Sequence, residues 1–523
     1  MAASAITVET LPSYNPATGE TLGHVDTTSP GALPGILKQA RAVQSYWKDQ
    51  PLPKRLALVR ALGEQMLERK DELADTIVRE SGKPRVEAFF ADVFVALDTA
   101  KYIASHAAQL LSPEPVDHHS TAAKAKSGTI YYEPIGVAGI ISSWNYPLAI
   151  PLGQMIPALA AGNAVICKNS EFTPQCGVLI EKLFLEAGFP KGLVTVVQGG
   201  GAVGQALISA SPDKIFFTGS VATGRRVAEA CAAKLIPSVL ELGGKDAMLV
   251  LADADIEVAS SAAVWGSYTN CGQVCLSVER LYVDEKVSEK FIQLCVEKTK
   301  KLRLGPGTHP DSDVGPMIRP QHVARMTDLI DDAVEMGARV LCGGRPRPDL
   351  GPCFFEPTVI VGVDASMRLF QEETFGPILA IRTVSGEEEA VRLANDSPFA
   401  LSASVWSSDN ARGESVAKGL RAGAVMVNDA ISYFAIAEAP HGGCGASGWG
   451  RTHGRAGLRE MVQTKYIDVD RLPHAEKAWW YRYNENLNHD ASAFLKFEFG
   501  SGIPAKLRNV RDALKTFFRD HGL

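Results

Sequence analysis

The sequence lacks the residue patterns that bind metal ions. It contains no Cys-x-x-Cys pair and no His-Glu-x-x-His segment, and its 11 histidines form no other ligand set. Structural and catalytic zinc sites are built from such closely spaced side chains. The sequence therefore predicts no metal ion.

Long runs of one charge and a leader segment are also missing. The chain has 53 basic and 59 acidic residues, a net charge of −6, and no Lys/Arg run that would neutralise a phosphate backbone. This balance disfavours a nucleic acid as partner. The 9 cysteines are irregularly spaced, and no basic segment followed by an apolar one precedes the fold. Both features are typical of free thiols in a reducing compartment, so we expect a cytoplasmic protein.

One apolar stretch, residues 136–167, is hydrophobic enough to resemble a membrane span. It contains Pro147, Pro151 and Pro157, and prolines at this density break a spanning helix. We interpret the stretch as a buried strand, a turn and a helix of an α/β domain. The chain of 523 residues is long enough for two or three such domains.

Hydrophobic periodicity divides the chain into a helical region and two α/β regions. Residues 31–110 show helical periodicity, with one apolar face formed by Leu56, Val59, Leu62 and Met66. Strand-like apolar runs then alternate with helices, which predicts parallel sheets covered on both faces. The first set of expected strands is 137–142, 163–167, 193–197, 214–217 and 237–241. The second set is 247–251, 278–283, 339–341, 358–361, 378–383 and 425–427.

The most informative feature is a cysteine paired with an upstream glutamate. Cys275 ends the segment Asn270-Cys271-Gly272-Gln273-Val274-Cys275, and Glu241 lies between an apolar run and Gly243-Gly244. A thiol attacks best as the thiolate, and a neighbouring glycine lets backbone amides approach a developing oxyanion. An apolar setting raises the pKa of a carboxylate towards use as a general base. The alternative is that the cysteine is an inert core residue.

The segment from Phe217 to Gly224 predicts a phosphate-binding helix start. It follows an expected strand and begins the helical run Arg225–Ala233. Free amides and the dipole at a helix N-terminus favour a pyrophosphate. The spacing is not Gly-x-Gly-x-x-Gly, so this motif alone does not establish a dinucleotide site.

Several motifs, in order, resemble the aldehyde dehydrogenase superfamily over residues 13–465. The chain matches its pattern of Glu-Leu-Gly-Gly-Lys followed by Gly-Gln-x-Cys. Further matches are Tyr14-Asn15-Pro16-Ala17-Thr18-Gly19-Glu20, Ser143-Trp144-Asn145-Tyr146-Pro147, Phe217-Thr218-Gly219-Ser220, Glu373-Thr374-Phe375-Gly376-Pro377 and Ser447-Gly448-Trp449-Gly450-Arg451. The presence of Glu241 indicates the hydrolytic, non-acylating, NAD(P)-dependent branch.

The resemblance implies an α/β fold with a Rossmann-like cofactor domain, an α/β catalytic domain and a small β oligomerisation arm. The expected domains are 1–119 with 136–243 for NAD binding, 244–435 for catalysis, 120–135 with 436–470 for the arm, and 471–523 as a C-terminal extension. A homodimer or homotetramer is the implied assembly.

The resemblance also implies the catalytic roles. Cys275 would attack an aldehyde, while Asn145 and the backbone amide of Cys275 stabilise the oxyanion, and Glu241 would activate water to hydrolyse the resulting thioester. The alternatives are an NADP-linked or coenzyme A-acylating relative and a catalytically silent structural protein. Cys271 is interpreted as a packing residue, with a reversible disulfide to Cys275 as the alternative under oxidation.

The implied cofactor contacts are Trp144, Lys168, Glu171, Gly201, Gly219, Ser220, Glu373 and Phe375. Glu171 would accept hydrogen bonds from ribose hydroxyls and repel a 2′-phosphate, which favours NAD over NADP. The alternative is that Glu171 is a solvent-exposed charge on a loop and does not contact a cofactor. His441 and Gly445 stand where the family usually has an aromatic residue and a lysine, so the substrate does not follow by analogy.

Residues 471–523 extend beyond the usual end of this fold. They include the aromatic segment 479–483 and an expected amphipathic helix over 503–518. We expect this tail to dock on its own or a neighbouring subunit. The alternatives are a plug at the substrate tunnel and a peripheral membrane contact. Aliphatic, aromatic and longer lipophilic aldehydes all stay open as substrates, with a slight preference for bulky apolar ones.

Overall fold

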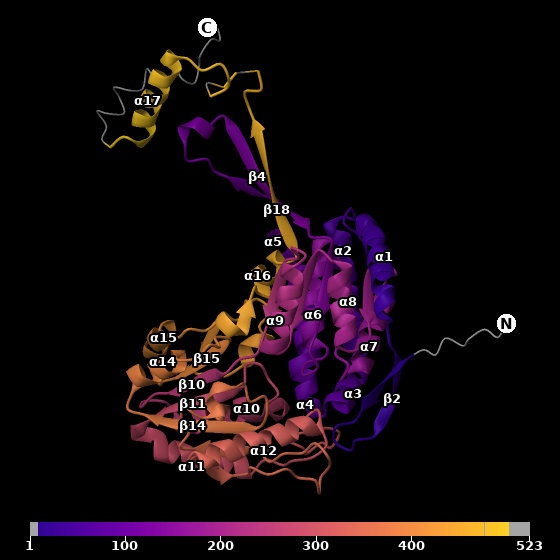
Figure 1. Ribbon diagram of the computed structural model, residues 1–523, viewed down its shortest axis with the longest axis vertical. Coiled ribbons are helices and arrows are strands. Elements are labelled where there is room, and N and C mark those ends of the chain that lie inside the picture. The colour runs from indigo at the N-terminus through magenta and orange to yellow at the C-terminus, as the bar shows by residue number, and fades with distance from the viewer. Residues whose placement is uncertain (1–8, 475, 478, 502–523) are drawn as a thin grey trace, which may run out of the picture. The chain divides into compact units, whose positions relative to one another are not determined.

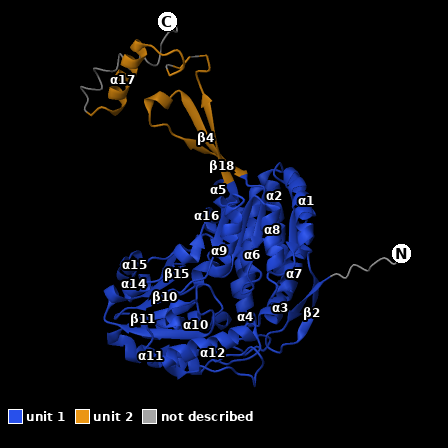
Figure 2. Cartoon of the chain, viewed as in Figure 1, with its two compact units in different colours: residues 1–110, 134–462 blue, residues 111–133, 463–523 orange. Residues whose placement is uncertain are grey.

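The chain forms two compact units in the computed structural model, which describes residues 9–474, 476–477 and 479–501. Unit 1 comprises residues 1–110 and 134–462, and unit 2 comprises residues 111–133 and 463–523 (Figure 2). Each unit has its own sheet structure. Unit 1 contains all of the residues predicted for catalysis and cofactor binding.

The first sheet of unit 1 has six strands in the order β17-β9-β8-β5-β6-β7. Their bounds are β5 (Val137–Ile141), β6 (Ala164–Lys168), β7 (Val194–Val197), β8 (Lys214–Thr218), β9 (Ser238–Glu241) and β17 (Gly448–Trp449). All pairs are parallel except β17 with β9. The chain proceeds outwards from β5 to β6 and β7, and then continues on the other side with β8 and β9. The strand order therefore reverses between β5 and β8, the place where α/β sheets bind ligands.

Helices cover both faces of this sheet, which explains the continuous apolar strands (Figure 1). On one face lie α6 (Ala149–Ala161) and α7 (Pro174–Glu186), backed by α2 (Leu52–Glu68) and α5 (Phe94–Leu110). On the other face lie α1 (Leu33–Trp47), α8 (Gly201–Ala210) and α9 (Val221–Ala232). The predicted apolar face of residues 56–66 is the buried face of α2.

The apolar stretch 136–167 folds as β5, α6 and β6. Every residue of α6 is buried, since the helix lies between the sheet and the α2–α5 layer. This burial on all sides requires an apolar surface all round. In the part of the chain that the structure describes, no helix is long and apolar enough to cross a membrane.

The second sheet of unit 1 has seven strands in the order β12-β13-β14-β11-β10-β15-β16. The bounds are β10 (Asp246–Val250), β11 (Val278–Asp284), β12 (Arg339–Cys342), β13 (Thr358–Val361), β14 (Ile378–Val384), β15 (Ser402–Trp406) and β16 (Ala424–Val427). Only the β12–β13 pair is antiparallel. Helices that pack against it include α10 (Ile256–Tyr268), α11 (Glu285–Lys300), α14 (Glu387–Asn395) and α15 (Asn410–Lys418). The two sheets confirm the expected α/β architecture.

Unit 2 is built on a three-stranded sheet in the order β18-β4-β3. The strands are β3 (Glu114–Val116), β4 (Lys126–Pro134) and β18 (Val462–Asp470). Strands β4 and β18 overlap the two segments predicted for the arm, 120–135 and 436–470, while a role of these strands in assembly stays a prediction. A further helix, α17 (Glu485–Phe499), contacts the same unit, because Glu498 accepts a hydrogen bond of 3.1 Å from the backbone amide of Thr121. The helix expected over 503–518 lies outside the described residues.

Candidate active site

Several of the predicted site residues lie at or shortly after the carboxyl ends of the parallel strands of the first sheet. Asn145 follows β5, Lys168 ends β6, Gly219 and Ser220 follow β8, and Glu241 ends β9. Because these ends share one edge, segments distant in sequence meet there. The edge includes the reversal of strand order between β5 and β8.

A cavity of about 840 Å³ opens at this edge. Its lining includes all three predicted catalytic residues, Cys275, Glu241 and Asn145. It also includes part of the predicted cofactor set, namely Trp144, Gly219, Ser220, Glu373 and Phe375. The remaining predicted contacts, Lys168, Glu171 and Gly201, do not line this cavity.

Cys275 reaches the cavity on a sharply turned loop that follows α10. Asn270 and Cys271 both have left-handed backbone conformations, with φ of 50° and 56°. Gln273 holds the turn, since its side chain donates to the Asn270 carbonyl at 2.9 Å and accepts from the Ile318 amide at 2.8 Å. Cys271 is buried in the core of the second sheet, so of the two thiols it is Cys275 that faces the cavity.

The surroundings of Cys275 favour the protonated thiol over the thiolate. Burial raises its pKa, and the carboxylates of Asp246, Glu373 and Glu241 raise it further. The thiolate is the nucleophilic form. Attack on a carbonyl therefore requires the proton to leave Sγ first.

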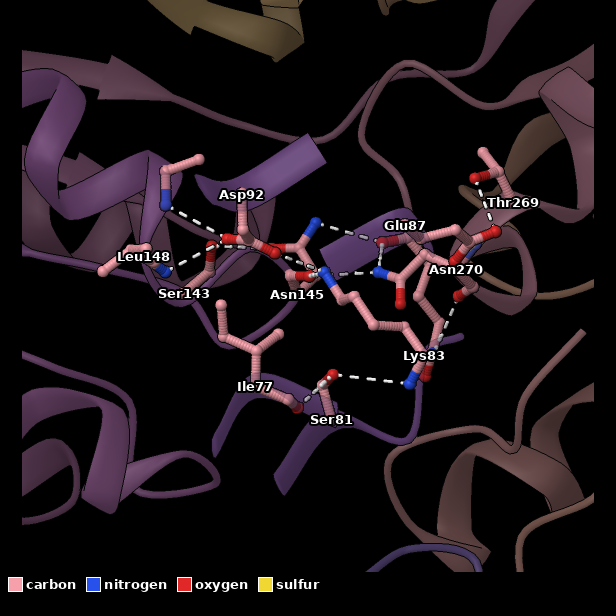
Figure 3. A network of polar contacts seen from close by, with 12 residues as sticks. Ile77, Ser81, Lys83, Glu87, Asp92, Ser143, Asn145, Leu148, Thr269 and Asn270 are labelled. Atoms are coloured by element: carbon pink, nitrogen blue, oxygen red, sulfur yellow. Dashed lines mark hydrogen bonds and ion pairs between the residues drawn. The ribbon is translucent and has the colours of Figure 1, made fainter. Parts of the chain in front are cut away.

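Asn145 is hydrogen-bonded to the loop that carries Cys275, residues 269–275 (Figure 3). Its side-chain Nδ2 donates to the Gln273 carbonyl at 3.1 Å, and its Oδ1 accepts from the Ser143 hydroxyl at 2.8 Å. Its own carbonyl accepts from Asn270 Nδ2 at 3.0 Å. An amide nitrogen carries two hydrogens, so a second N–H of Asn145 is available for an oxyanion.

A buried ion pair supports this arrangement and was not anticipated from the sequence. Lys83 Nζ lies 2.7 Å from Asp92 Oδ2, with both side chains fully buried, and also donates to the Asn145 carbonyl at 2.6 Å. Asp92 Oδ1 accepts from the amides of Leu148 and Ala149 at the start of α6, each at 3.1 Å. The Lys83–Asp92 pair thus links the segment before α5 to the N-terminus of α6 and to the turn at Asn145.

Glu87 fixes the other half of the loop. It accepts hydrogen bonds of 2.9 Å from the Thr269 hydroxyl and from the Asn270 amide. Burial raises the pKa of Glu87 to about 7. The left-handed turn that carries Cys275 is therefore held by a carboxyl group from α4 (Arg85–Glu87).

Glu241 lies in an apolar setting at the cavity wall. Its side chain is buried, and within the described part of the chain neither carboxyl oxygen has a hydrogen-bond partner. His441 is a polar neighbour of this carboxylate, with its Nε2 3.5 Å from Oε2. Burial raises the pKa of Glu241 well above its usual value. A raised pKa gives a carboxylate the higher proton affinity that a general base needs.

Aromatic rings and a carboxylate also line the cavity. Trp144 packs edge-on against Phe375, with ring centroids 5.6 Å apart. The turn at Phe375 has a φ of 53°, and Glu279 holds it by accepting from the Phe375 amide at 2.9 Å. Glu279 is itself paired with the buried Lys245 at 2.7 Å. Sequence motifs gave no role to this Lys245–Glu279 pair.

The carboxylate of Glu373 lies against the backbone of Gly243. A side chain at position 243 would collide with it. Burial raises the pKa of Glu373 to about 8, and the charge of Glu279 adds to this effect. The absence of a side chain at Gly243 therefore lets the Glu373 carboxylate lie close to the backbone there and face the cavity.

The remaining predicted cofactor residues gather at the starts of two helices. Lys168 Nζ is paired with Glu171 Oε2 at 2.7 Å, and the Glu171 carboxylate faces Gly200, immediately before α8 begins at Gly201. Ser220 caps α9 by accepting from the Thr223 amide at 3.3 Å. Backbone amides at a helix start and a neighbouring carboxylate are groups that can bind the pyrophosphate and a ribose of a dinucleotide.

Comparison with known proteins gives one consistent result. The model of the aldehyde dehydrogenase family matches residues 3–467. A 4,4'-diapolycopene aldehyde oxidase of Methylomonas sp is 36% identical over 516 residues, covering 97% of this chain and 95% of that protein. A candidate NADP(+)-linked succinate-semialdehyde dehydrogenase of Mycolicibacterium smegmatis is 37% identical over 456 residues, covering 87% and 88%.

Solved structures give the same result for the fold. The Mycobacterium tuberculosis aldehyde dehydrogenase complexed with NAD+ has a TM-score of 0.84 and 32% identity, covering 89% of this chain and 95% of that chain. An NADP dependent enzyme of E. coli has a TM-score of 0.84 and 32% identity, covering 88% and 95%.

Proposed function

The chain belongs to the aldehyde dehydrogenase family, and from this premise we propose that it oxidises an aldehyde to the carboxylic acid with NAD. The observation that carries the proposal is the meeting of Cys275, Glu241 and Asn145 in one cavity with the aromatic wall of Trp144 and Phe375. A thiol, an amide donor and a raised-pKa carboxyl group together suffice for thioester chemistry.

In the proposed mechanism Cys275 Sγ loses its proton to solvent water and then forms a bond to the aldehyde carbon, whose C=O π electrons move to oxygen. The oxyanion accepts hydrogen bonds from Asn145 Nδ2 and from the Cys275 amide. Bound NAD would supply the acceptor for the hydride that leaves the aldehyde carbon. The acyl group then remains on Cys275 as a thioester. Glu241 takes a proton from water as the water oxygen adds to the acyl carbon. Cleavage of the C–S bond then releases the acid and the Cys275 thiolate, and the proton held by Glu241 returns the thiolate to the thiol.

The preference for NAD rests on Glu171. A carboxylate at the helix start beside Gly200 accepts hydrogen bonds from ribose hydroxyls and repels a 2′-phosphate. Its partner Lys168 is already paired with it, which reduces the positive charge available for a phosphate. The similar solved structures include an NADP dependent enzyme and a complex with NAD+, so similarity alone does not favour either cofactor. The proposal of NAD for this chain therefore depends on Glu171.

We propose a bulky apolar aldehyde as substrate. Phe90, Phe94 and Trp265 line the cavity and are 66%, 47% and 48% exposed, which places these rings at its mouth. Farther in, the lining includes Ile431 and Phe434. Apolar and aromatic linings of this kind bind apolar ligands. The relative named as an oxidase of 4,4'-diapolycopene aldehyde is consistent with this choice.

The charges of the cavity disfavour a semialdehyde that carries a carboxylate. Among the described lining residues Arg325 is the one Lys or Arg, and it is bonded to Glu372 at 3.1 Å and to the Glu373 carbonyl at 2.9 Å. Burial lowers the pKa of His441 and His453, so both rings are neutral at neutral pH. A carboxylate is normally recognised by a cation or by several directed donors.

The test is formation of reduced cofactor by the purified protein with a panel of aldehydes. The panel includes short aliphatic, aromatic and long apolar aldehydes and succinate semialdehyde, each with NAD and with NADP, and Cys275→Ala is the control. Acid production with NAD that is lost in Cys275→Ala is expected. Acyl-coenzyme A formed on addition of coenzyme A would favour the acylating alternative, and no turnover with any aldehyde would favour a silent protein.

A further inference from the structure

An imidazole occupies the cavity wall next to Glu241, where the family usually has an aromatic ring. His441 is 4% exposed and is anchored by two backbone hydrogen bonds of 2.8 Å with Thr452. Phe434 packs edge-on against its ring, with centroids 4.9 Å apart. The backbone and ring contacts hold the imidazole in one position.

The two nitrogens of this ring face different partners. Nδ1 lies 2.9 Å from the hydroxyl of Tyr433, and Nε2 lies 3.5 Å from Glu241 Oε2. Tyr433 is buried in the short helix η5 (Ser432–Ala435), and burial raises its pKa well above 10, so its oxygen keeps its hydrogen. A hydroxyl that donates to Nδ1 leaves the hydrogen of the neutral imidazole on Nε2, facing Glu241.

We propose that His441 is a positioning residue that donates a hydrogen bond from Nε2 to the Glu241 carboxylate during thioester hydrolysis. The proposal rests on the proposed function, because it assigns His441 to the base of that reaction. The 3.5 Å separation is longer than a hydrogen bond, so the proposal requires the Glu241 carboxylate to move closer to Nε2 in the reaction. Catalytic hydrogen bonds are often long before substrate binds.

The charges around the pair agree with a neutral donor. His453 and Arg451 face His441, and together with burial they keep the pKa of His441 well below 6.5. The charge of Arg451 lowers the pKa of Glu241, and the charge of Glu460 raises it. The Arg451 guanidinium is bonded to the carbonyls of residues 443 and 450, so its effect on Glu241 is at a distance.

A neutral hydrogen-bond donor would stabilise the ionised form of Glu241. The carboxyl oxygens of Glu241 otherwise have no hydrogen-bond partner among the described residues, and an unsolvated carboxylate is hard to form. A hydrogen bond from Nε2 stabilises the ionised form without adding a charge. Tyr433 contributes by holding the tautomer that carries the hydrogen on Nε2.

His441→Phe restores the usual aromatic ring and removes the donor. We expect the hydrolysis step to slow roughly tenfold to a hundredfold at neutral pH, as for loss of a hydrogen bond to a charged group. The pH at which hydrolysis reaches half of its maximum should rise. Thioester formation should be retained, because Cys275 and Asn145 keep their contacts. His441→Gln keeps an N–H donor and should restore most of the rate, and Tyr433→Phe should produce a weaker form of the same defect.

The experiment separates the two steps with rapid-mixing kinetics. The burst of reduced cofactor reports acylation, and the steady rate reports hydrolysis. A second assay uses 4-nitrophenyl acetate, which acylates a thiol without any cofactor. His106→Phe is the matched control, because this ring stacks on Tyr102 of α5, with centroids 4.7 Å apart, and is not among the described residues that line the cavity. Its pH midpoint should equal that of the parent protein.

Two outcomes would overturn the inference: a His441→Phe protein with the parental pH profile of hydrolysis, or a His441→Gln protein as slow as His441→Phe. A parent protein with neither burst nor turnover would instead contradict the proposed function. The Gln and Tyr433→Phe variants keep the inference testable if the Phe variant fails to fold.

Discussion

The ammonium of Lys83 donates a hydrogen bond of 2.6 Å to the backbone carbonyl of Asn145 (Figure 3). This bond ties the oxyanion donor of the proposed mechanism to a buried ion pair, since Lys83 also contacts Asp92 at 2.7 Å. The position of the Asn145 turn therefore depends on a lysine that lies 62 residues upstream.

Lys83→Met should both destabilise the protein and reduce its turnover. The substitution leaves Asp92 as a buried charge without its cation, which costs about 3–5 kcal/mol. Chemical unfolding measures this loss. The double variant Lys83→Met/Asp92→Asn removes the charge and should recover part of the stability. Arg303→Met, which breaks the exposed pair with Asp313, is the control and should change stability little. Equal losses of stability in Lys83→Met and Arg303→Met would contradict the conclusion that Lys83 neutralises a buried charge.

Turnover should rise with pH if Glu241 is the base. Burial raises the pKa of Glu241 well above 4.5, so the protonated form persists to higher pH and the carboxylate appears only as pH rises through that pKa. The pKa of Cys275 is also raised, so the burst should rise with pH too. Glu241→Gln should keep the burst and lose the steady turnover. A Glu241→Gln protein with parental turnover would rule out this base.

Glu171→Gln should relax the choice of cofactor. Loss of the carboxylate removes the repulsion of a 2′-phosphate and releases Lys168, whose Nζ lies 2.7 Å from Glu171 Oε2. We expect the ratio of kcat/KM for NADP to that for NAD to rise by roughly tenfold, a modest effect because Glu171 is partly exposed. Glu181→Gln on α7 is a control for the change of charge. An unchanged ratio would show that cofactor choice lies elsewhere.

Trp265→Ala should weaken binding of long apolar aldehydes. Its ring is half-exposed at the cavity mouth, so only a long substrate reaches it. Loss of a contact of this size should raise KM for a long aldehyde by roughly tenfold and leave a short aliphatic aldehyde unaffected. Steady-state kinetics with both substrates provide the measurement. A parallel change for both would indicate a general loss of structure.

Removal of residues 473–523 should leave the kinetics on short and long aldehydes unchanged. The described contact of this tail is with its own unit, where Glu498 on α17 bonds Thr121. Kinetics and analytical ultracentrifugation of the truncated chain test this expectation. A higher rate on long aldehydes alone would support a plug, and a loss of liposome binding would support a membrane contact.

Local pattern in the sequence determined the fold class and the catalytic candidates. Strands such as β5 and β6 are buried on both faces, so their apolar runs are continuous and recognisable. Cys275, Glu241 and Asn145 stand in short motifs beside glycines or turns, and such motifs can be read without knowledge of distant contacts. The strand β15 escaped this reasoning because it alternates Ser402 and Ser404 with apolar residues, and Ser402 is buried through its hydrogen bond to Asp246.

Tertiary structure alone decided which residues support the site. The contacts of Lys83 with Asn145 and of Glu87 with Asn270 join segments that meet only when the helices before α6 pack against the loop after α10. The approach of His441 to Glu241 likewise depends on the pairing of β17 with β9. Such pairs carry no periodicity or fixed spacing, since the order of the strands and the packing of helices set their distance.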